Sequence, residues 1–563
     1  MWSLFKRKRR SVDIYPDEVL ADTQQIYPED ISGGESRINI PLSSVSVLVL
    51  AGIFLLIGLL LLSKIWFVQI VQGEDYLLKS ERNRLTFQPI FAERGVIYDR
   101  LGEMLAWNGF NSDDDSFFVR RYTDTLGVAH AVGYTNPPLK DSSGFYYQDY
   151  YKGVDGVEKY FDEYLSGTNG LVFRERDALG QILSENIFEE SSSGKALHLS
   201  IDSRLQEELY LIIKSLADDV GFKAGSGVLM DVKTGELITM VNYPEYDLSV
   251  MASRDSKSID QMILELNMPF LNRAISGQYT PGSVVKPFVA IGALEENVID
   301  PKKYLTSTKT ITIPNPYNPS QPSVFRDWRV HEQVDMVRAL AVSSNVYFYK
   351  IGGGFGAQEG IGINKIKEYM ELFGFESETG INLNEEKSGV VPDPTWKEKI
   401  FNDVWRVGDT YNTAIGQFGF QATPLQVTRA VSALANGGYL VTPTILKQDN
   451  NTDNFVGNSI GVSSENIKVV NDGMRSAVVD GTAGGLNLHY LPVSAKTGTA
   501  QTGATKRVHS WITGFYPSDD PKYAFTILME DGSEDNLIGG VFVMRQFLDW
   551  MHKNTPEYVL FED

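Results

Sequence analysis

The sequence contains no cysteine. This absence excludes disulfide scaffolds, cysteine-based zinc sites, iron–sulfur clusters and cysteine nucleophiles. Basic residues are outnumbered, because 51 Lys and Arg stand against 72 Asp and Glu and leave a formal net charge of −21. Nucleic-acid-binding proteins usually carry a basic surface, so nucleic acid is not an expected partner. The six histidines are scattered and form no His-Glu-x-x-His pair, so we expect no metal site.

The chain is long and has the ordinary composition of a folded protein. Its 563 residues predict about three to four domains at roughly 150 residues each. The apolar share of 42% is enough for a large core, and 50 Gly with 23 Pro is well below the share in collagen-like or low-complexity chains. We therefore expect a globular protein of several domains.

One long uncharged run lies near the N-terminus, at residues 38–63, where 26 consecutive residues carry no charge. As a helix it would rise roughly 39 Å, enough to cross a hydrocarbon core of about 30 Å. A buried core helix and a signal peptide are the alternatives, but the run is too long for a signal peptide and ends without a cleavage site. Basic residues precede it at 6–10. We therefore expect a cytoplasmic tail at 1–37, a transmembrane anchor at 38–70 and the remaining chain outside.

The part after the anchor divides in two. Residues 71–195 contain short hairpin-like strands and polar loops, and the polar stretch 189–194 marks the expected boundary. Residues 196–563 combine strand-like and helical patterns, which predicts an α+β unit whose sheet uses both halves of the sequence. The clearest expected elements are strands at 226–232, 236–242, 510–515 and 523–530 and helices at 334–342 and 424–435.

Three short motifs follow one another in this last part: Ser283-Val-Val-Lys286, Ser343-Ser-Asn345 and Lys496-Thr-Gly498. Each is weak alone, because the chain also holds chance copies of each pattern. The copies lie at 3–6 and 192–195 for the first motif, at 184–186 and 464–466 for the second, and at 233–235 for the third. The surroundings of each copy must therefore decide which ones have a function.

Ser283 follows a Pro-Gly pair and opens an apolar run that is typical of a helix. A helix start places its hydroxyl near free backbone N–H groups and the positive end of the helix dipole, which stabilise negative charge. Lys286 lies one turn further on the same face, at the spacing that a base needs to take the serine proton. The alternative is a helix-capping serine beside a solvated lysine.

The other two motifs carry groups that suit a substrate. Lys496 lies among small residues, where a strand would let backbone approach a ligand and the ammonium group would attract a carboxylate. Ser343 and Asn345 follow a predicted helix, and their hydroxyl and amide would relay a proton and hold a substrate amide. Capping of the preceding helix is their alternative role. The copy at 233–235 is followed by Glu236-Leu-Ile, so we expect a plain hairpin turn there.

Together the three motifs resemble those of the serine acyltransferases that bind penicillin. Specifically, the chain resembles the class B, monofunctional penicillin-binding proteins, which are peptidoglycan D,D-transpeptidases. Similar family blocks occur in the family's order: Leu271-Asn-Arg-Ala-Ile275, Pro281-Gly-Ser283, Thr423-Pro-Leu-Gln426, Ala435-Asn-Gly-Gly438 and Trp511-Ile-Thr-Gly-Phe515. Upstream, the stretches Arg94-Gly-Val-Ile-Tyr-Asp-Arg100 and Gly156-Val-Glu-Lys-Tyr160 resemble the non-catalytic pedestal of this family. The resemblance covers about residues 40–550.

The resemblance implies a membrane-anchored, multidomain fold. One transmembrane helix would be followed by a mainly β pedestal of the dimerisation type at 71–195. An α+β penicillin-binding or transpeptidase domain would follow at 196–563, with an antiparallel sheet flanked by helices. Two departures from the family pattern stand out. The pedestal is short, which would reduce its usual partner contacts, and Val284 stands where a small hydroxyl residue is common.

Within class B, one region resembles the elongation type, penicillin-binding protein 2. Its residues are Trp396-Lys397, Trp405-Arg-Val-Gly-Asp-Thr410 and Ile415-Gly-Gln417. The division type is the alternative subclass.

The resemblance also assigns roles to the first two motifs. Ser283 would attack the carbonyl of the penultimate D-Ala in a stem peptide, and a neutral Lys286 would accept the serine proton. Ser343 would pass a proton to the departing D-Ala, and Asn345 would hold the substrate amide. An amine from a neighbouring stem peptide would then resolve the acyl-enzyme and form a crosslink.

The third motif is implied to bind the substrate. A cationic Lys496 and Thr497 would hold the terminal carboxylate and polarise the hydroxyl of the second motif. The expected substrate-binding residues are Thr497, Gly498 and Thr499. The amides of Ser283 and Thr499 would form the oxyanion hole, where each donor contributes about 3–4 kcal/mol in comparable sites.

The implied ligands are stem peptides ending in D-Ala-D-Ala and the β-lactams that mimic this end, and no cofactor is implied. A multi-spanning membrane glycosyltransferase is the expected partner, because no polymerising domain fits between anchor and pedestal. The expected location is the bacterial plasma (inner) membrane, single-pass, with a cytoplasmic N-terminus and an extracytoplasmic catalytic domain. The alternative functions are a D,D-carboxypeptidase or β-lactamase-like hydrolase on the same scaffold and a non-catalytic membrane scaffold for a glycosyltransferase.

Overall fold

The computed structural model describes residues 44–77, 85–110, 117–142, 146–176, 181–315, 318, 320–448, 457–503 and 506–561. The chain forms two units, residues 1–84 and 85–563. In the first unit, α2 (Ser44–Trp66) continues into a π-helical turn, η2 (Phe67–Val71). The predicted cytoplasmic tail at 1–37 and the first residues of the predicted anchor, 38–43, lie outside the described residues.

The helix of the first unit fits a membrane span by length and composition. Its 28 residues from Ser44 to Val71 rise about 42 Å as a helix, more than the roughly 30 Å of a hydrocarbon core. None of its side chains is buried in the structure, although nearly all are apolar. Among the described residues it is the one helix that could cross a membrane, in agreement with the predicted anchor.

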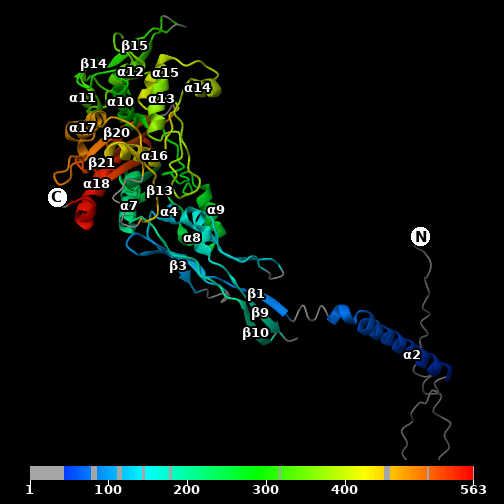
Figure 1. Cartoon of the computed structure of the whole chain (residues 1–563). Coiled ribbons are helices and arrows are strands. Elements are labelled where there is room, and N and C mark those ends of the chain that lie inside the picture. The colour runs from blue at the N-terminus through cyan, green and yellow to red at the C-terminus, as the bar shows by residue number, and fades with distance from the viewer. Residues whose placement is uncertain are drawn as a thin grey trace, which may run out of the picture. The chain divides into compact units, whose positions relative to one another are not determined.

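The second unit begins with a mainly β region, as predicted for the pedestal (Figure 1). Its first sheet is antiparallel in the order β1-β9-β10, and its second has the order β11-β2-β3-β4. The strands of these sheets are β1 (Leu85–Ile90), β9 (Gly170–Arg176), β10 (Ile182–Glu189), β11 (Leu197–His198), β2 (Ile97–Tyr98), β3 (Met104–Gly109) and β4 (Val119–Tyr122). The smaller elements are β5 (Thr135–Asn136), β6 (Leu139–Lys140), β7 (Tyr146–Gln148), β8 (Lys152–Gly153), α4 (Ala129–Val132), α5 (Gly156–Tyr160) and α6 (Asp162–Ser166).

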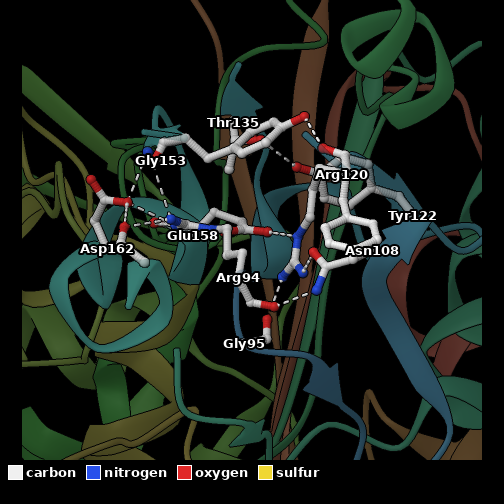
Figure 2. Close-up of polar contacts among 12 residues, drawn as sticks. Arg94, Gly95, Asn108, Arg120, Tyr122, Thr135, Gly153, Glu158 and Asp162 are labelled. Atoms are coloured by element: carbon white, nitrogen blue, oxygen red, sulfur yellow. Dashed lines mark hydrogen bonds and ion pairs between the residues drawn. The ribbon is translucent and has the colours of Figure 1, made fainter. Parts of the chain in front are cut away.

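A buried ion-pair network holds the pedestal together (Figure 2). The Glu158 carboxylate, fully buried on α5, accepts hydrogen bonds from Arg94 Nε at 2.6 Å and from Arg120 Nε at 2.7 Å. Arg94 also contacts Asp162 on α6 at 2.8 Å, and Asn108 on β3 donates to the Arg94 carbonyl at 2.7 Å. Both pedestal blocks seen in the sequence therefore meet at one carboxylate.

The pedestal block at 94–100 also contacts the start of the region predicted to be catalytic, residues 196–563, which is called the catalytic region from here on. Asp99 is fully buried, and its Oδ2 accepts a hydrogen bond of 2.8 Å from the hydroxyl of Ser203, the first residue of α7 (Ser203–Val220). Strand β11 pairs in parallel with β2. The two regions are therefore joined by main-chain pairing as well as by a buried carboxylate.

A five-stranded antiparallel sheet forms the centre of the catalytic region, in the order β13-β12-β22-β21-β20. Its strands are β12 (Ala224–Asp231), β13 (Leu237–Tyr243), β20 (Ser494–Gln501), β21 (Arg507–Tyr516) and β22 (Tyr523–Ser533). The predicted strand pairs and the hairpin at 233–235 are confirmed. Since β22 lies between β12 and β21, the sheet uses both halves of the sequence, as expected.

Alternate residues of the strands bury the two faces of the sheet in different cores. On β21, Trp511 packs into a core built mainly from helices between η3 (Gly282–Val285) and α17 (Ser464–Asp480), whereas Ile512 packs with α7 and α18 (Gly540–Asn554). In Figure 1, one side of β20 and β21 is covered by α10 (Lys286–Glu295), α12 (Asn345–Gly353) and α13 (Ile363–Leu372), and the other by α7 and α18. The sheet is thus flanked by helices on both faces, as predicted.

The remaining elements complete this region. The helices are α8 (Leu248–Ser253), α9 (Ser256–Leu264), η3 (Gly282–Val285), α10 (Lys286–Glu295), α11 (Met336–Ala341), α12 (Asn345–Gly353), α13 (Ile363–Leu372), α14 (Pro394–Phe401), α15 (Val407–Ala414), α16 (Pro424–Ala435), α17 (Ser464–Asp480), η4 (Gly484–Leu486) and η5 (Pro556–Tyr558). The short strands are β14 (Leu305–Ser307), β15 (Thr310–Ile313), β16 (Ser323–Arg326), β17 (Glu332–Val334), β18 (Tyr439–Val441) and β19 (Gly457–Ser459). The predicted helices at 334–342 and 424–435 correspond to α11 and α16.

Candidate active site

Ser283 lies in η3, a short 3-10 turn that leads directly into α10. The sequence predicts that an α-helix opens at Ser283, but the α-helix itself begins at Lys286. Residues i and i+3 eclipse one another in a 3-10 turn, so the predicted alignment of the two side chains is preserved. Gly282 has φ of +59° and donates its N–H to the Gly416 carbonyl at 3.0 Å. A left-handed glycine thus starts the turn, where a side chain would be strained.

Lys286 is completely buried, because residues 286–294 of α10 all lie inside the helical core. Its ammonium donates to the Ser343 carbonyl at 2.8 Å, the Ser343 hydroxyl at 3.3 Å and Asn345 Oδ1 at 2.7 Å. Ser343 and Asn345, which lie 57 and 59 positions after Lys286 in the chain, therefore both contact its Nζ atom.

The second motif forms the sharp turn between α11 and α12. Ser343 adopts φ of +57°, a left-handed conformation that is uncommon for serine. The hydroxyl of Ser344 caps α12 by accepting a hydrogen bond of 3.1 Å from Tyr347 N. The alternative role as a cap of α11 is met by the backbone, because Ser343 N donates to the Leu340 carbonyl at 3.2 Å and Ser344 N to the Ala339 carbonyl at 3.0 Å. The side chains of Ser343 and Asn345 instead bind the lysines of the site.

Lys496 enters the same cluster from β20. It is fully buried and donates to the Ser343 hydroxyl at 2.8 Å and to the Thr497 carbonyl at 2.8 Å. Thr497 forms a hydroxyl–hydroxyl hydrogen bond of 2.7 Å with Thr482. The Ser343 hydroxyl is therefore shared by two buried lysines from different elements.

Glycine at 498 allows β20 to pass close to the turn that carries the serine. A Cβ atom on Gly498 would lie 2.8 Å from the Pro281 carbonyl oxygen and 2.9 Å from Val284 Cγ1. A Cβ on Gly282 would lie 2.8 Å from the Thr499 carbonyl oxygen. The exposed Thr499 thus lies beside the turn of Ser283, which is the proximity that a shared oxyanion hole requires.

Burial lowers the pKa of both lysines. It lowers the pKa of Lys286 to about 7, although the nearby Asp327 carboxylate acts in the opposite direction. Burial also lowers the pKa of Lys496 well below its usual value, and the charge of Lys286 lowers it further. Two buried ammonium groups that share one hydroxyl disfavour each other's charge. Burial and the charge of Lys286 thus both act against a cationic Lys496 in the chain by itself, and its charge stays a prediction.

The structure brings three of the motif copies together and leaves the other described copies apart. Ser192 is exposed, the copy at 233–235 forms the β12–β13 turn, the copy at 184–186 lies on β10 and the copy at 464–466 begins α17. The copy at 3–6 lies outside the described residues. Among the described residues, no hydrogen bond joins the Ser283 side chain to Lys286, whose ammonium instead contacts the second motif.

One residue beside the site, Asp327, has no signal in the sequence. Its buried carboxylate lies next to the second motif and accepts a hydrogen bond from the Ser344 hydroxyl at 2.9 Å. A single aspartate in the stretch Phe325-Arg-Asp-Trp328 matches no motif, and only the folded chain brings it there.

Comparison with known proteins identifies the family. Residues 225–542, more than half of the chain, match the model of the penicillin-binding protein transpeptidase domain. The chain therefore belongs to the penicillin-binding protein transpeptidase family. Residues 115–199 match the penicillin-binding protein dimerisation domain, which agrees with the predicted type of pedestal.

Curated relatives and solved structures define the subclass. The peptidoglycan D,D-transpeptidase MrdA of Haemophilus influenzae is 27% identical over 85% of this chain and 87% of its own length. MrdA of Escherichia coli K12 is 26% identical over 88% of this chain and 92% of its own. The Helicobacter pylori PBP2 in complex with MreC has a TM-score of 0.69 at 28% identity, covering 83% of this chain and 99% of that chain. Pseudomonas aeruginosa PBP2 in complex with WCK 5153 also scores 0.69, at 27% identity, covering 85% of this chain and 98% of that chain.

These similarities confirm the predicted resemblance to class B penicillin-binding proteins of the elongation type. They also confirm the predicted enzyme class, peptidoglycan D,D-transpeptidase.

Proposed function

We propose that this chain crosslinks peptidoglycan stem peptides during cell-wall elongation through an acyl-enzyme at Ser283. The observation that carries the proposal is the convergence of Lys286, Ser343, Asn345 and Lys496 on one hydrogen-bonded cluster beside the serine turn. A base and substrate-binding groups gathered beside the turn that carries the nucleophile are the arrangement that nucleophilic catalysis requires.

The acylation step uses the first two motifs. The Ser283 oxygen forms a bond to the carbonyl carbon of the penultimate D-Ala while its proton passes to the neutral amine of Lys286. The bond from that carbon to the terminal D-Ala nitrogen then breaks, and the leaving amine takes a proton through the Ser343 hydroxyl. Asn345 orients the substrate amide. The 2.7 Å contact from Lys286 to Asn345 supports this assignment, because it holds the base and the amide-binding group together.

The third motif binds the substrate end. Lys496 and Thr497 hold the terminal carboxylate, and the N–H groups of Ser283 and Thr499 stabilise the developing oxyanion. A carboxylate beside Lys496 raises the pKa of this lysine, so substrate binding makes it cationic while Lys286 stays neutral. Gly498 allows the close approach of β20 that this arrangement needs.

The acylation rate is expected to fall below pH 7. Because burial lowers the pKa of Lys286 to about 7, the neutral amine is abundant above this pH and is lost below it by up to about tenfold per pH unit. Second-order rate constants for acylation by penicillin, measured from pH 5 to 9, test this. Lys286→Met should lose both rate and pH dependence, whereas Lys233→Met, in the exposed hairpin copy, should match wild type. A flat wild-type profile would exclude Lys286 as the base.

Membrane topology and partners complete the proposal. The basic residues at 6–10 favour a cytoplasmic N-terminus, which leaves an extracytoplasmic pedestal at 71–195 and transpeptidase domain at 196–563 in the bacterial plasma membrane. The glycan strands come from a multi-spanning glycosyltransferase partner. The Helicobacter pylori PBP2 was solved with MreC, and we propose a partner of that kind for this chain as well.

Crosslinking itself distinguishes a transpeptidase from a hydrolase. The full chain is reconstituted in vesicles with a glycosyltransferase and lipid-linked pentapeptide precursor, and the digested products are separated by mass. Crosslinked dimers are expected, and they should be missing with Ser283→Ala. Shortened monomeric peptides without dimers would instead identify a D,D-carboxypeptidase, and unchanged pentapeptides would contradict catalysis under these conditions.

A further inference from the structure

A single buried carboxylate ties three segments together behind the second motif. Asp327 is only 3% exposed. Its Oδ2 accepts hydrogen bonds from the Ser307 hydroxyl at 3.2 Å, the Ser344 hydroxyl at 2.9 Å and Val346 N at 3.0 Å. Its Oδ1 accepts from Trp328 N at 2.9 Å. The end of β14, the loop after β16 and the first turn of α12 therefore share one anionic acceptor.

The link to the site runs through Ser344. This residue is fully buried, and its hydroxyl bonds to Asp327 and, at 2.7 Å, to the hydroxyl of Ser307. Its neighbours on either side, Ser343 and Asn345, are the two residues that hold the Lys286 ammonium. Fixing the middle residue of the turn therefore fixes both of the residues that contact the base.

The loop around Asp327 also forms hydrogen bonds at both ends of the turn. Trp328 Nε1 donates to the Val342 carbonyl at 3.2 Å, just before Ser343. Asn345 Nδ2 donates to the Arg326 carbonyl at 3.4 Å. Ser343 has φ of +57°, and such a conformation persists only where the surroundings hold it in place. The end of α11, whose Leu340 and Ala339 carbonyls accept hydrogen bonds from Ser343 N and Ser344 N, and the loop at 326–328 together supply that support.

Asp327 also acts on the charge of the base. Its carboxylate raises the pKa of Lys286 against the larger lowering effect of burial. The other groups facing the ammonium are Lys496 from β20, Ser343 and Asn345 from the turn, the Phe348 ring from α12 and, at longer range, His331. Burial lowers the pKa of His331, so this side chain is neutral at pH 7 and Asp327 is the anion among these groups.

We propose that Asp327 is a positioning residue for acylation, which holds the Ser343–Asn345 turn against Lys286 through the hydroxyl of Ser344. This rests on the proposed function, because the turn matters only if Lys286 acts on Ser283. Misplacing reacting groups by about 1 Å reduces rates about 100-fold, and the turn has no other buried anion among the described residues to hold it.

The test compares Asp327→Asn with wild type in the full chain in detergent, by the rate of penicillin acylation from pH 5 to 9. Asparagine keeps the side-chain shape but removes the charge and one acceptor. We expect a loss of about 10–100-fold in rate at pH 8, with one adduct per chain still reached at long times. The acid limb of the profile, which is the fall in acylation rate at low pH, should move to lower pH, because losing the carboxylate charge lowers the pKa of Lys286. The matched control is Asp335→Asn. Asp335 caps α11 by accepting a hydrogen bond from Arg338 N at 2.9 Å, and the acylation rate of this variant should stay within twofold of the wild-type rate.

Ser344→Ala keeps the charge of Asp327 and removes the link, together with the bonds of this hydroxyl to Tyr347 N and Ser307, so it should slow acylation without moving the fall in rate to lower pH. It also carries the test if Asp327→Asn fails to fold. An Asp327→Asn enzyme with the wild-type rate and profile would overturn the proposal. An acylation rate that falls only as much as the folded fraction of the variant falls, with the acid limb at its wild-type pH, would also overturn it. If wild type itself forms no adduct, the proposed function fails and this inference fails with it, whereas an adduct on wild type with unaffected variants rejects this inference alone.

Discussion

Ser283→Ala is expected to abolish the covalent adduct that the wild-type chain forms with penicillin. The hydroxyl is the nucleophile in the proposed reaction, and no neighbouring side chain offers a replacement. Ser343 carries another hydroxyl in the motif cluster, but it is held by Lys286 and Lys496 at 3.3 and 2.8 Å. Removing a nucleophile leaves only the binding groups, which form no acyl-enzyme. The expected effect is therefore complete loss rather than a slower reaction.

Intact mass after incubation with penicillin measures this directly, with full-length chain in detergent. Wild type should gain one stable adduct, and the alanine variant should gain none. Ser192→Ala is the matched control, because Ser192-Ser-Gly-Lys195 has the same motif pattern but its serine is exposed on a loop of the pedestal. An adduct on Ser283→Ala would refute the assignment. Rapid loss of the wild-type adduct would favour the hydrolase alternative, and full growth and shape with Ser283→Ala in cells would favour the scaffold.

Glu158→Gln is expected to destabilise the pedestal by about 3–5 kcal/mol, the usual result of removing one partner from a buried ion pair. Two arginines, each 3% exposed, donate to this carboxylate. Glutamine has nearly the same volume, so no cavity contributes to the loss. What remains is two guanidinium groups buried away from water, with Asp162 on α6 as the remaining anion in contact with Arg94.

Denaturant unfolding followed by tryptophan fluorescence measures this loss, and Trp107 on β3 lies in the pedestal sheet itself. Glu163→Gln is the matched control, because this glutamate lies exposed on α6 a few residues away and should change stability by less than about 0.5 kcal/mol. Equal stability of Glu158→Gln and wild type would show that the network contributes little net free energy, which would contradict the role given to it here.

The sequence predicted the elements of the catalytic region well, because their signals are local. The strand patterns, the turn at 233–235 and the helical pattern at 424–435 each involve residues close together in the chain. The three motifs were recognisable for the same reason. Their assembly was not, since Lys496 and Ser343 are 153 positions apart, and only their family order indicated that they meet.

Two features of the site could not be predicted from residue patterns. The lowered pKa values of Lys286 and Lys496 come mainly from complete burial, and that of Lys496 also from the nearby charge of Lys286, and the spacing of a motif contains neither. Asp327 accepts hydrogen bonds from Ser344 and Val346, which lie 17 and 19 residues further along the chain. A lone buried carboxylate looks like any surface aspartate in a sequence, because burial is a property of the fold.

The strand order of the central sheet has a consequence for how a newly made chain becomes active. β12 pairs along its whole length with β22, from Ala224↔Glu530 to Asp231↔Tyr523. A chain that emerges from its N-terminus at about 5–20 residues per second must therefore wait for some 300 further residues before the partner of β12 arrives. Until then one edge of β12 is unpaired and open to wrong pairing. A delay in translation after β12 should thus change the yield of active enzyme more than the same delay placed after β22.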